Sequence, residues 1–225
     1  MKKNKIFVAC DTSNINKINK IITETKSSNL KVGYKFGLEF LNSKNGRTFV
    51  SKIKNKTVFA DLKLHDIPNT VKKSIKGLAL LPIKMITIHI SGGKDMMIAA
   101  MEAVAGTKIK IFGVTALTSL NNEQTKQIFK RTTSEQVNAM LDLAELVGID
   151  GVICSPHELE LVKKRRSLLS ITPGIRLQNL NDDQKRVMTP KEANNLGADY
   201  LVIGRPITES DDISESLDEI YSSIQ

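Results

Sequence analysis

Short apolar runs alternate with longer amphipathic segments along the whole chain of 225 residues. The runs are of strand length and rich in Val, Ile and Phe, which is typical of buried β-strands. We expect strands at residues 5–11, 30–35, 57–63, 85–91, 109–117, 151–155, 168–174 and 200–205. Because these runs follow one another at regular intervals, the pattern predicts repeated strand–helix units.

Between the expected strands, apolar residues recur at the spacing of one helix face. The best examples are Ile15, Ile18, Ile21 and Ile22, then Met96, Met97, Ala100 and Met101, then Val137, Met140, Leu141 and Ala144. N-caps are expected at Thr12 or Ser13, at Ser134, at Ser155 before Pro156, and at Thr189 before Pro190. With no break in composition, we expect residues 1–225 to form a single (β/α)8 TIM barrel of the α/β class. A doubly wound open sheet is the alternative.

The bulk composition is that of an ordinary globular protein, with 40% hydrophobic and 25% charged residues. No apolar run approaches the roughly 18 residues of a membrane span, and the N-terminus does not resemble a secretory signal. Cys10 and Cys154 each lie in an expected strand, which favours reduced thiols in a cytoplasmic protein.

The net charge of +9 raises the question of a nucleic-acid partner. The 33 Lys and Arg residues are scattered, and the aromatic content of 4% without Trp supplies few stacking platforms. We therefore expect an anionic small molecule, and no nucleic acid, as the partner.

Charged residues gather where the expected strands end, which is where a barrel carries its active site. Asp61 and Lys63 are two apart on one strand and are expected to share a face. Asp11 and Lys35 end two other strands, and Asp66 follows just beyond the third. Such a cluster is typical of sites where catalytic pKa values are tuned, with a structural ion-pair network as the alternative.

The last two strands end in residues suited to a phosphate. Gly204 allows close approach to the backbone, and Arg205 offers a planar set of donors. Pro173, Gly174 and Arg176 follow the seventh strand. The alternative is that Arg176 and Arg205 are two surface cations in contact with solvent and bind no phosphate. The sequence contains no zinc-ligand spacing, dinucleotide fingerprint or Walker loop.

From VACD at 8–11 to VIGRPI at 202–207, the sequence resembles the orotidine 5'-phosphate decarboxylase family in its compact bacterial form. FADLKLHDIPNTV is similar to the Asp-x-Lys-x-x-Asp-Ile-x-x-Thr-Val signature, and TPGIR, Gln184 and GRPI to the phosphate-side segments. The resemblance implies decarboxylation of orotidine 5'-phosphate to UMP, the last step of de novo pyrimidine biosynthesis, without metal or organic cofactor.

The resemblance also implies residue roles. Lys35, Asp61, Lys63 and Asp66 would form an alternating charge array in which Lys63 protonates C6 of the pyrimidine. The other implied substrate contacts are Asp11 and Lys35 at the ribose, Thr118 and Ser119 near the pyrimidine, and Gln184, Gly204, Arg205, Arg176 and Pro173 around the phosphate. Gln184 would lie on a closing loop. A homodimer is implied, with Asp66 and Thr70 reaching the partner's site.

Two rival functions stay open. A Mg²⁺-dependent sugar-phosphate decarboxylase or aldolase of the same barrel superfamily would carry another acidic ligand near the second strand, where this chain has Lys35. The other is a non-catalytic β/α barrel that binds a phosphorylated ligand or RNA through its +9 charge. Of the histidines, His65 is expected to point away from Asp61 and Lys63, and His89 either lines the pocket or packs in the barrel.

Overall fold

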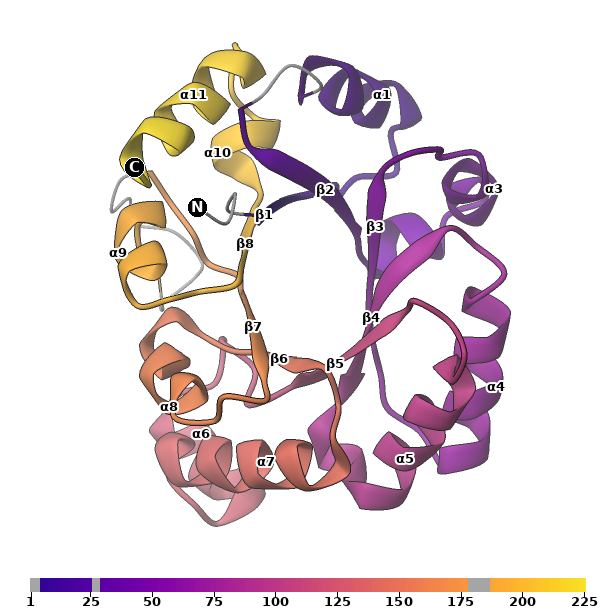
Figure 1. The fold of residues 1–225 in the computed structure, drawn as a ribbon, viewed down its shortest axis with the longest axis vertical. Coiled ribbons are helices and arrows are strands. Elements are labelled where there is room, and N and C mark those ends of the chain that lie inside the picture. Colours follow the sequence, from indigo (N-terminus) through magenta and orange to yellow (C-terminus); the bar gives the residue numbers. More distant parts are fainter. Residues whose placement is uncertain (1–4, 26–28, 178–186) are drawn as a thin grey trace.

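The computed structural model describes residues 5–25, 29–177 and 187–225. Its strands are all parallel and close into a barrel in which each pairs with the next and the eighth pairs with the first (Figure 1). The strands are β1 (Lys5–Ala9), β2 (Lys31–Phe36), β3 (Thr57–Leu64), β4 (Ile83–His89), β5 (Lys110–Val114), β6 (Gly151–Ile153), β7 (Leu169–Thr172) and β8 (Tyr200–Ile203). The predicted (β/α)8 barrel is confirmed, and closure excludes the open doubly wound sheet.

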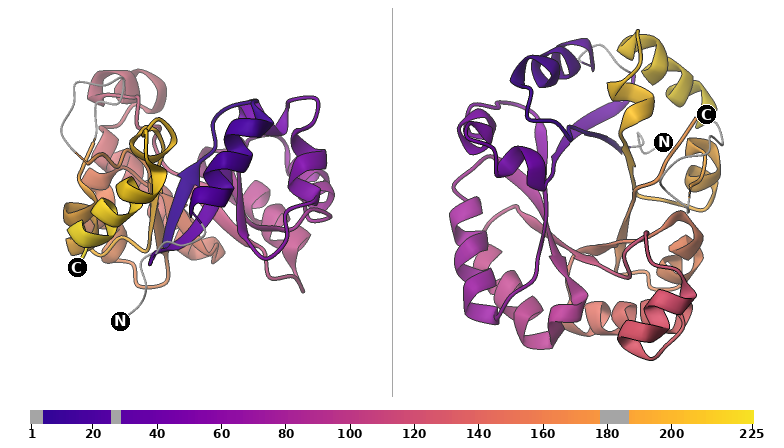
Figure 2. Two further views of the ribbon diagram at one scale, coloured as in Figure 1. Left: turned by 90° about the horizontal axis from the view of Figure 1, so that it is seen from above. Right: turned by 180° about the vertical axis from the view of Figure 1, so that it is seen from behind.

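Helices surround the barrel, as the view from behind also shows (Figure 2). They are α1 (Ile15–Glu24), α2 (Leu38–Leu41), α3 (Gly46–Ser51), α4 (Pro68–Leu78), α5 (Gly93–Val104), α6 (Asn122–Phe129), α7 (Thr133–Val147), α8 (Leu159–Lys163), α9 (Pro190–Asn195), α10 (Arg205–Thr208) and α11 (Ile213–Ser223), with 3₁₀ helices η2 (Ile90–Gly92) and η3 (Pro156–Glu158). The ring is completed where α11 contacts α1. In the described part of the chain, no helix is long and apolar enough to cross a membrane.

The core has two layers, because side chains alternate between the two faces of each strand. The larger layer lies between the strands and the surrounding helices, and includes the predicted helix faces around Ile18, Met97 and Leu141. The smaller one contains Phe7, Ala9, Phe59, Met85, Phe112, Ile171, Tyr200 and Val202. Its aromatic rings contact one another edge to face or tilted. The second layer gives the barrel a packed interior below the ends of the strands.

Two of the expected helix caps were wrong. Asn14, and neither Thr12 nor Ser13, caps α1, because its Oδ1 accepts hydrogen bonds from the N–H groups of residues 16 and 17 at 3.0 and 3.2 Å. Thr132 rather than Ser134 caps α7, where it forms a capping box with Glu135. In both helices the capping side chain lies two or three residues before the free N–H groups that it meets. Thr189 caps α9 as predicted.

Candidate active site

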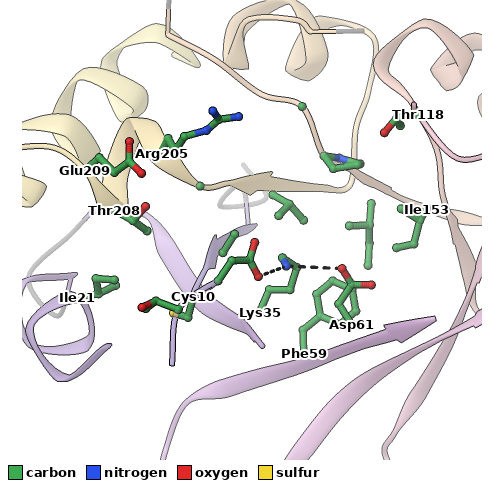
Figure 3. Close-up of a pocket in the computed structure, with 18 of the residues that line it drawn as sticks. Cys10, Ile21, Lys35, Phe59, Asp61, Thr118, Ile153, Arg205, Thr208 and Glu209 are labelled. Atoms are coloured by element: carbon green, nitrogen blue, oxygen red, sulfur yellow. Dashed lines mark hydrogen bonds and ion pairs between the residues drawn. The ribbon is translucent and has the colours of Figure 1, made fainter. Parts of the chain in front are cut away.

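A cavity of about 460 Å³ opens at the carboxyl ends of the strands, and its size is typical of a site for a small ligand. Charged residues from three neighbouring strand ends line it, namely Asp11 after β1, Lys35 on β2, and Asp61 and Lys63 on β3. In Figure 3, Lys35 and Asp61 lie on one side of the cavity, and Arg205 and Thr118 lie across from them. The predicted collection of charge at this end of the barrel is therefore present.

The four charged side chains form one continuous chain of alternating sign. Lys35 Nζ lies 2.8 Å from Asp11 Oδ1 and 3.6 Å from Asp61 Oδ2. Lys63 Nζ donates a hydrogen bond to the same Asp61 Oδ2 at 2.8 Å. Each ammonium group thus has a carboxylate beside it, and Asp61 is shared by both. The alternation keeps four charges together without a large net charge.

Lys35 and Asp61 are buried, so each keeps its charge because oppositely charged groups lie beside it. Only 9% of the Lys35 side chain and 12% of the Asp61 side chain are exposed. Burial favours a neutral carboxyl, but the charges of Lys35 and Lys63, with hydrogen bonds from Lys63 and Thr87, outweigh it and lower the pKa of Asp61. Burial likewise opposes the ammonium form of Lys35, but Asp61 and Asp11 outweigh it and raise its pKa. Both groups are therefore charged at neutral pH.

The backbone that presents Asp61 and Lys63 is not a regular strand, which corrects the expectation of simple alternation. Ala60 pairs with Ile86 and Leu64 with Ile88, so residues 61–63 of β3 lie opposite a single residue of β4. Lys63 has a φ of 48°, in the left-handed region that a residue with a side chain adopts rarely. The two side chains still meet, but an irregular strand brings them together. Bulges of this kind are common beside active sites.

A glycine allows the close approach of the first two charges. A Cβ atom at Gly37 would lie 3.0 Å from Asp11 Oδ1 and 3.6 Å from Lys35 Nζ. A side chain at this position would therefore press on the carboxylate oxygen that accepts the Lys35 hydrogen bond. The absence of a side chain leaves the Asp11–Lys35 pair undisturbed.

The opposite side of the cavity carries the residues predicted to meet a phosphate. Gly204 and Arg205, at the end of β8, line it, as do Pro173 and Arg176 after β7. Arg176 is buried, and its Nη1 donates to the carbonyl oxygen of Ile175 at 3.1 Å. The cavity therefore joins a charged array and a pair of guanidinium groups in one space.

Other predicted residues lie elsewhere. Thr118 lines the cavity, whereas Ser119 does not and lies with Thr118 at a neighbouring hollow. Asp66 and Thr70 are exposed and do not line the cavity of their own chain. Gln184 lies outside the described residues. The single chain thus brings together three members of the predicted four-residue array and leaves Asp66 at the surface.

The two histidines near the array contact each other. The rings of His65 and His89 are 5.3 Å apart between centroids and inclined by 36°. His65 is exposed, and His89 is half-buried and does not line the cavity. Burial, followed by the nearby His65 and Lys63, lowers the pKa of His89. His89 therefore does not line the cavity, which was one of the two expectations, and its ring lies half-buried against His65 rather than deep in the barrel.

Several residues at the site escaped the sequence analysis. Lys17 on α1 and Thr208 and Glu209 after β8 line the cavity. Thr87 is buried on β4 and is hydrogen-bonded to both Asp61 and Lys63. The one signal for Thr87 was a hydroxyl inside the otherwise apolar run MITIHI, two residues before His89. In the described residues, no group of three or more His, Cys, Asp or Glu side chains is placed to hold a metal ion.

Comparison with known proteins gives a consistent result over the full length. The family model described as "Orotidine 5'-phosphate decarboxylase / HUMPS family" matches residues 4–220. The orotidine 5'-phosphate decarboxylase of Wolbachia pipientis subsp. Culex pipiens (strain wPip) is 43% identical, with 98% of this chain and 99% of the relative covered. That of Ehrlichia canis (strain Jake) is 42% identical, with 98% of each covered. The crystal structure of orotidine 5'-phosphate decarboxylase from Lactobacillus acidophilus matches with a TM-score of 0.84 and 33% identity, covering 99% of both chains.

Proposed function

The chain belongs to the orotidine 5'-phosphate decarboxylase / HUMPS family, and from this premise we propose how its charged cavity carries out the reaction. It is a carboxy-lyase that converts orotidine 5'-phosphate to UMP in pyrimidine biosynthesis. We propose that Lys35, Asp61 and Lys63 are its catalytic residues, and that Asp66 of a second subunit completes the array.

One observation carries this proposal, the continuous chain from Asp11 through Lys35 and Asp61 to Lys63 inside the cavity. Loss of CO₂ from C6 of a pyrimidine leaves an electron pair without an adjacent carbonyl to accept it. Known enzymes reach rate enhancements on the order of 10¹⁷-fold for such difficult steps. Charges held in place before the reaction stabilise the transition state without reorganisation, and a buried array with fixed partners provides them.

The proposed step balances with the residues of the array. The bond between C6 and the carboxylate carbon breaks, CO₂ leaves, and the electron pair remains on C6. Lys63 Nζ stabilises that charge and then donates a proton to C6, which gives UMP. With 33% of its side chain exposed, Lys63 can regain a proton from solvent. Asp61 lies beside Lys63 and, in this proposal, next to the departing carboxylate.

The far side of the cavity is proposed to bind the rest of the substrate. Arg205, Gly204 and Arg176 would bind the phosphate, with Pro173 forming part of the wall. Asp11 and Lys35 would bind the ribose hydroxyls, and Thr118 would lie near the pyrimidine. Binding energy from the phosphate, which does not react, can then be used to position the ring against Lys63.

Lys35 separates this proposal from the Mg²⁺-dependent rival. That rival requires an acidic metal ligand near the second strand, where this chain places an ammonium group 3.6 Å from Asp61. A cation at this point would repel a divalent metal ion and occupies the space beside the carboxylate. The family name covers more than one activity, but the relatives described above are orotidine 5'-phosphate decarboxylases.

We propose that the active form is a homodimer in which Asp66 and Thr70 reach the partner's cavity. Asp66 lies two residues before α4 and Thr70 in its first turn, and both are exposed and outside the cavity of their own chain. Ile67, between them, is 66% exposed, and in the proposed dimer the partner would cover it. The proposed dimer would thus add the fourth charge to each array.

A reducing compartment such as the cytoplasm is proposed for the enzyme. Cys10 and Cys154 are both free and buried. Burial raises the pKa of Cys10 to about 12, so its thiol stays protonated although it lies next to the cavity.

Substitution of Lys63 tests the proposal. The variant Lys63→Ala should lose orotidine 5'-phosphate decarboxylation by at least about 10³-fold, because the proton donor and the stabilising charge are both removed. Loss of the substrate's ultraviolet absorbance measures the rate, and UMP titration and thermal unfolding check binding and fold. Lys110→Ala is the matched control, since this lysine also lies 2.8 Å from an aspartate, Asp150, but on the opposite end of the barrel. Turnover near that of the wild type in Lys63→Ala would overturn the proposed mechanism.

A further inference from the structure

The irregular part of β3 faces one residue of β4. Asp61, Leu62 and Lys63 lie between two regular pairs, Ala60 with Ile86 and Leu64 with Ile88, and only Thr87 stands opposite them. The left-handed φ of 48° at Lys63 belongs to this segment. Residues in this region of backbone space persist only when their surroundings hold them there. Contacts around Lys63 must therefore hold its backbone in this conformation.

Thr87 provides two hydrogen bonds at this point. The backbone N–H of Lys63 donates to Thr87 Oγ1 at 2.8 Å, and the Thr87 hydroxyl donates to Asp61 Oδ1 at 3.0 Å. A hydroxyl has one proton to donate and lone pairs to accept, so this single group serves both partners at once. Thr87 is fully buried, so solvent water cannot take over these two hydrogen bonds.

The two oxygens of Asp61 are divided between different partners. Oδ2 faces Lys63 Nζ at 2.8 Å and Lys35 Nζ at 3.6 Å, and Oδ1 accepts from Thr87. The ammonium groups hold Oδ2, and the hydroxyl holds Oδ1. The same hydroxyl accepts a hydrogen bond from the backbone N–H of Lys63, the residue that bears the proposed proton donor.

We infer that Thr87 is a positioning residue for decarboxylation, whose hydroxyl holds the Asp61 carboxylate and the left-handed backbone of Lys63 in one arrangement. This inference rests on the proposed roles of Asp61 and Lys63. Thr87 does not line the cavity and touches no substrate, so it acts through these two residues. A misplacement of about 1 Å at a reacting group can cost on the order of 100-fold in rate.

The same hydroxyl also acts on the charge of Asp61. A hydrogen bond donated to a carboxylate favours its ionised form. The charged or titratable groups around Asp61 are Lys35 from β2, Lys63 from β3 and His89 from β4, with Asp11 beyond Lys35. The same charged and titratable groups are present in a variant that lacks the hydroxyl. Loss of the Thr87 bond should therefore raise the pKa of Asp61 and move the acid limb of the rate profile to higher pH.

The experiment compares Thr87→Val, which keeps the shape and removes the hydroxyl, with Thr87→Ser, which keeps the hydroxyl. Thr87→Val should lower kcat by roughly 10- to 100-fold, change the UMP dissociation constant by less than about threefold, and shift the acid limb upward. Thr87→Ser should recover most of kcat and the wild-type pH profile. If Thr87→Val does not fold, Ser and Ala at this position make the same comparison, because they differ by the hydroxyl alone.

Thr115→Val is the matched control. Thr115 is also buried, and its hydroxyl donates one hydrogen bond, to the carbonyl oxygen of Ile153 at 3.0 Å. This variant should lose comparable thermal stability and keep kcat and the pH profile. Wild-type kcat and pH profile in Thr87→Val, or a Ser variant as impaired as the Val or Ala variant, would overturn the inference. The Lys63→Ala variant separates the proposed catalytic array from the positioning role of Thr87. Activity in Lys63→Ala would overturn the array itself. An inactive Lys63→Ala together with a normal Thr87→Val would overturn only the role of Thr87.

Discussion

Lys35 keeps its charge in a place where a lone ammonium group would lose it. Its side chain is 9% exposed, and burial by itself lowers the pKa of an amine. Asp61 and Asp11 lie on either side of it and reverse that effect, so its pKa is raised. Removal of either carboxylate leaves a buried charge without full compensation, which is far more costly than removal of an exposed ion pair. The charge of each residue in the array therefore depends on the charges of its neighbours.

Arg205 allows the phosphate side of the cavity to be tested independently of the array. Arg205→Ala should weaken UMP binding by roughly 10- to 100-fold, because a charge-assisted contact with the phosphate is lost. Uridine, which lacks the phosphate, should bind both forms equally, and titration calorimetry with the two ligands measures the difference. Arg47→Ala, at an exposed arginine of α3, is the control. Unchanged UMP affinity in Arg205→Ala would contradict the proposed phosphate site.

At the level of elements, strands and helices contribute different residues to the site. The strand ends carry the charges, and β3 does so through an irregular segment that its neighbour β4 holds in place. The helices contribute fewer groups, but α1 places Lys17 and Ile21 on the wall of the cavity. The position of this wall depends on how α1 begins, because its N-cap Asn14 lies only three residues after Asp11.

The cap of α1 should be measurable in stability. Asn14→Ala removes the side chain that accepts two N–H groups of the first turn, at 3.0 and 3.2 Å. The free energy of unfolding should fall by about 1 kcal/mol, and Tm by about 2–4 °C. Asn19→Ala, at an exposed position in the same helix, should be neutral or slightly stabilising, because alanine favours helix and no cap is lost. Equal effects of the two substitutions in thermal unfolding would show that Asn14 does not act as a cap.

At the level of the whole molecule, closure of the barrel creates the site. Residues as far apart in sequence as Asp11 and Glu209 line one cavity, because β8 pairs with β1 (Figure 1). In the proposed dimer a second chain adds Asp66 and Thr70, which the single chain leaves exposed. A complete site would then consist of parts from two chains.

Mixed dimers test this arrangement directly. Lys63→Ala and Asp66→Ala should each be inactive alone, but in a mixed dimer one of the two sites receives intact Lys63 from one chain and intact Asp66 from the other. In random co-expression half the dimers are mixed, and one of the two sites in each mixed dimer is intact. About a quarter of all sites should therefore be active, and the total activity should be about a quarter of the wild-type value. Lys63→Ala mixed with Asp61→Ala is the control and should stay inactive, because both residues act in their own chain's cavity. No recovery with Asp66→Ala would place Asp66 outside the partner's site.

Many features of this protein were predicted from local sequence patterns. All eight strands, the strand-end charges and the pair of arginines followed from apolar runs and from the rule that barrels place chemistry at carboxyl ends. Asn14 and Thr132 were missed as caps because Ser, Thr and Asn near a helix start have similar preferences, and only the hydrogen-bond geometry separates them.

The sequence by itself determined the barrel and the residue types at its mouth, because periodicity and strand-end position are local properties of the chain. Only the tertiary structure decided that Asp61 and Lys63 meet across an irregular strand, that Thr87 joins them, and that Asp66 stands outside the cavity of its own chain. These facts depend on the register between β3 and β4. A register is set by the packing of two strands against each other, and neither strand's sequence specifies it alone.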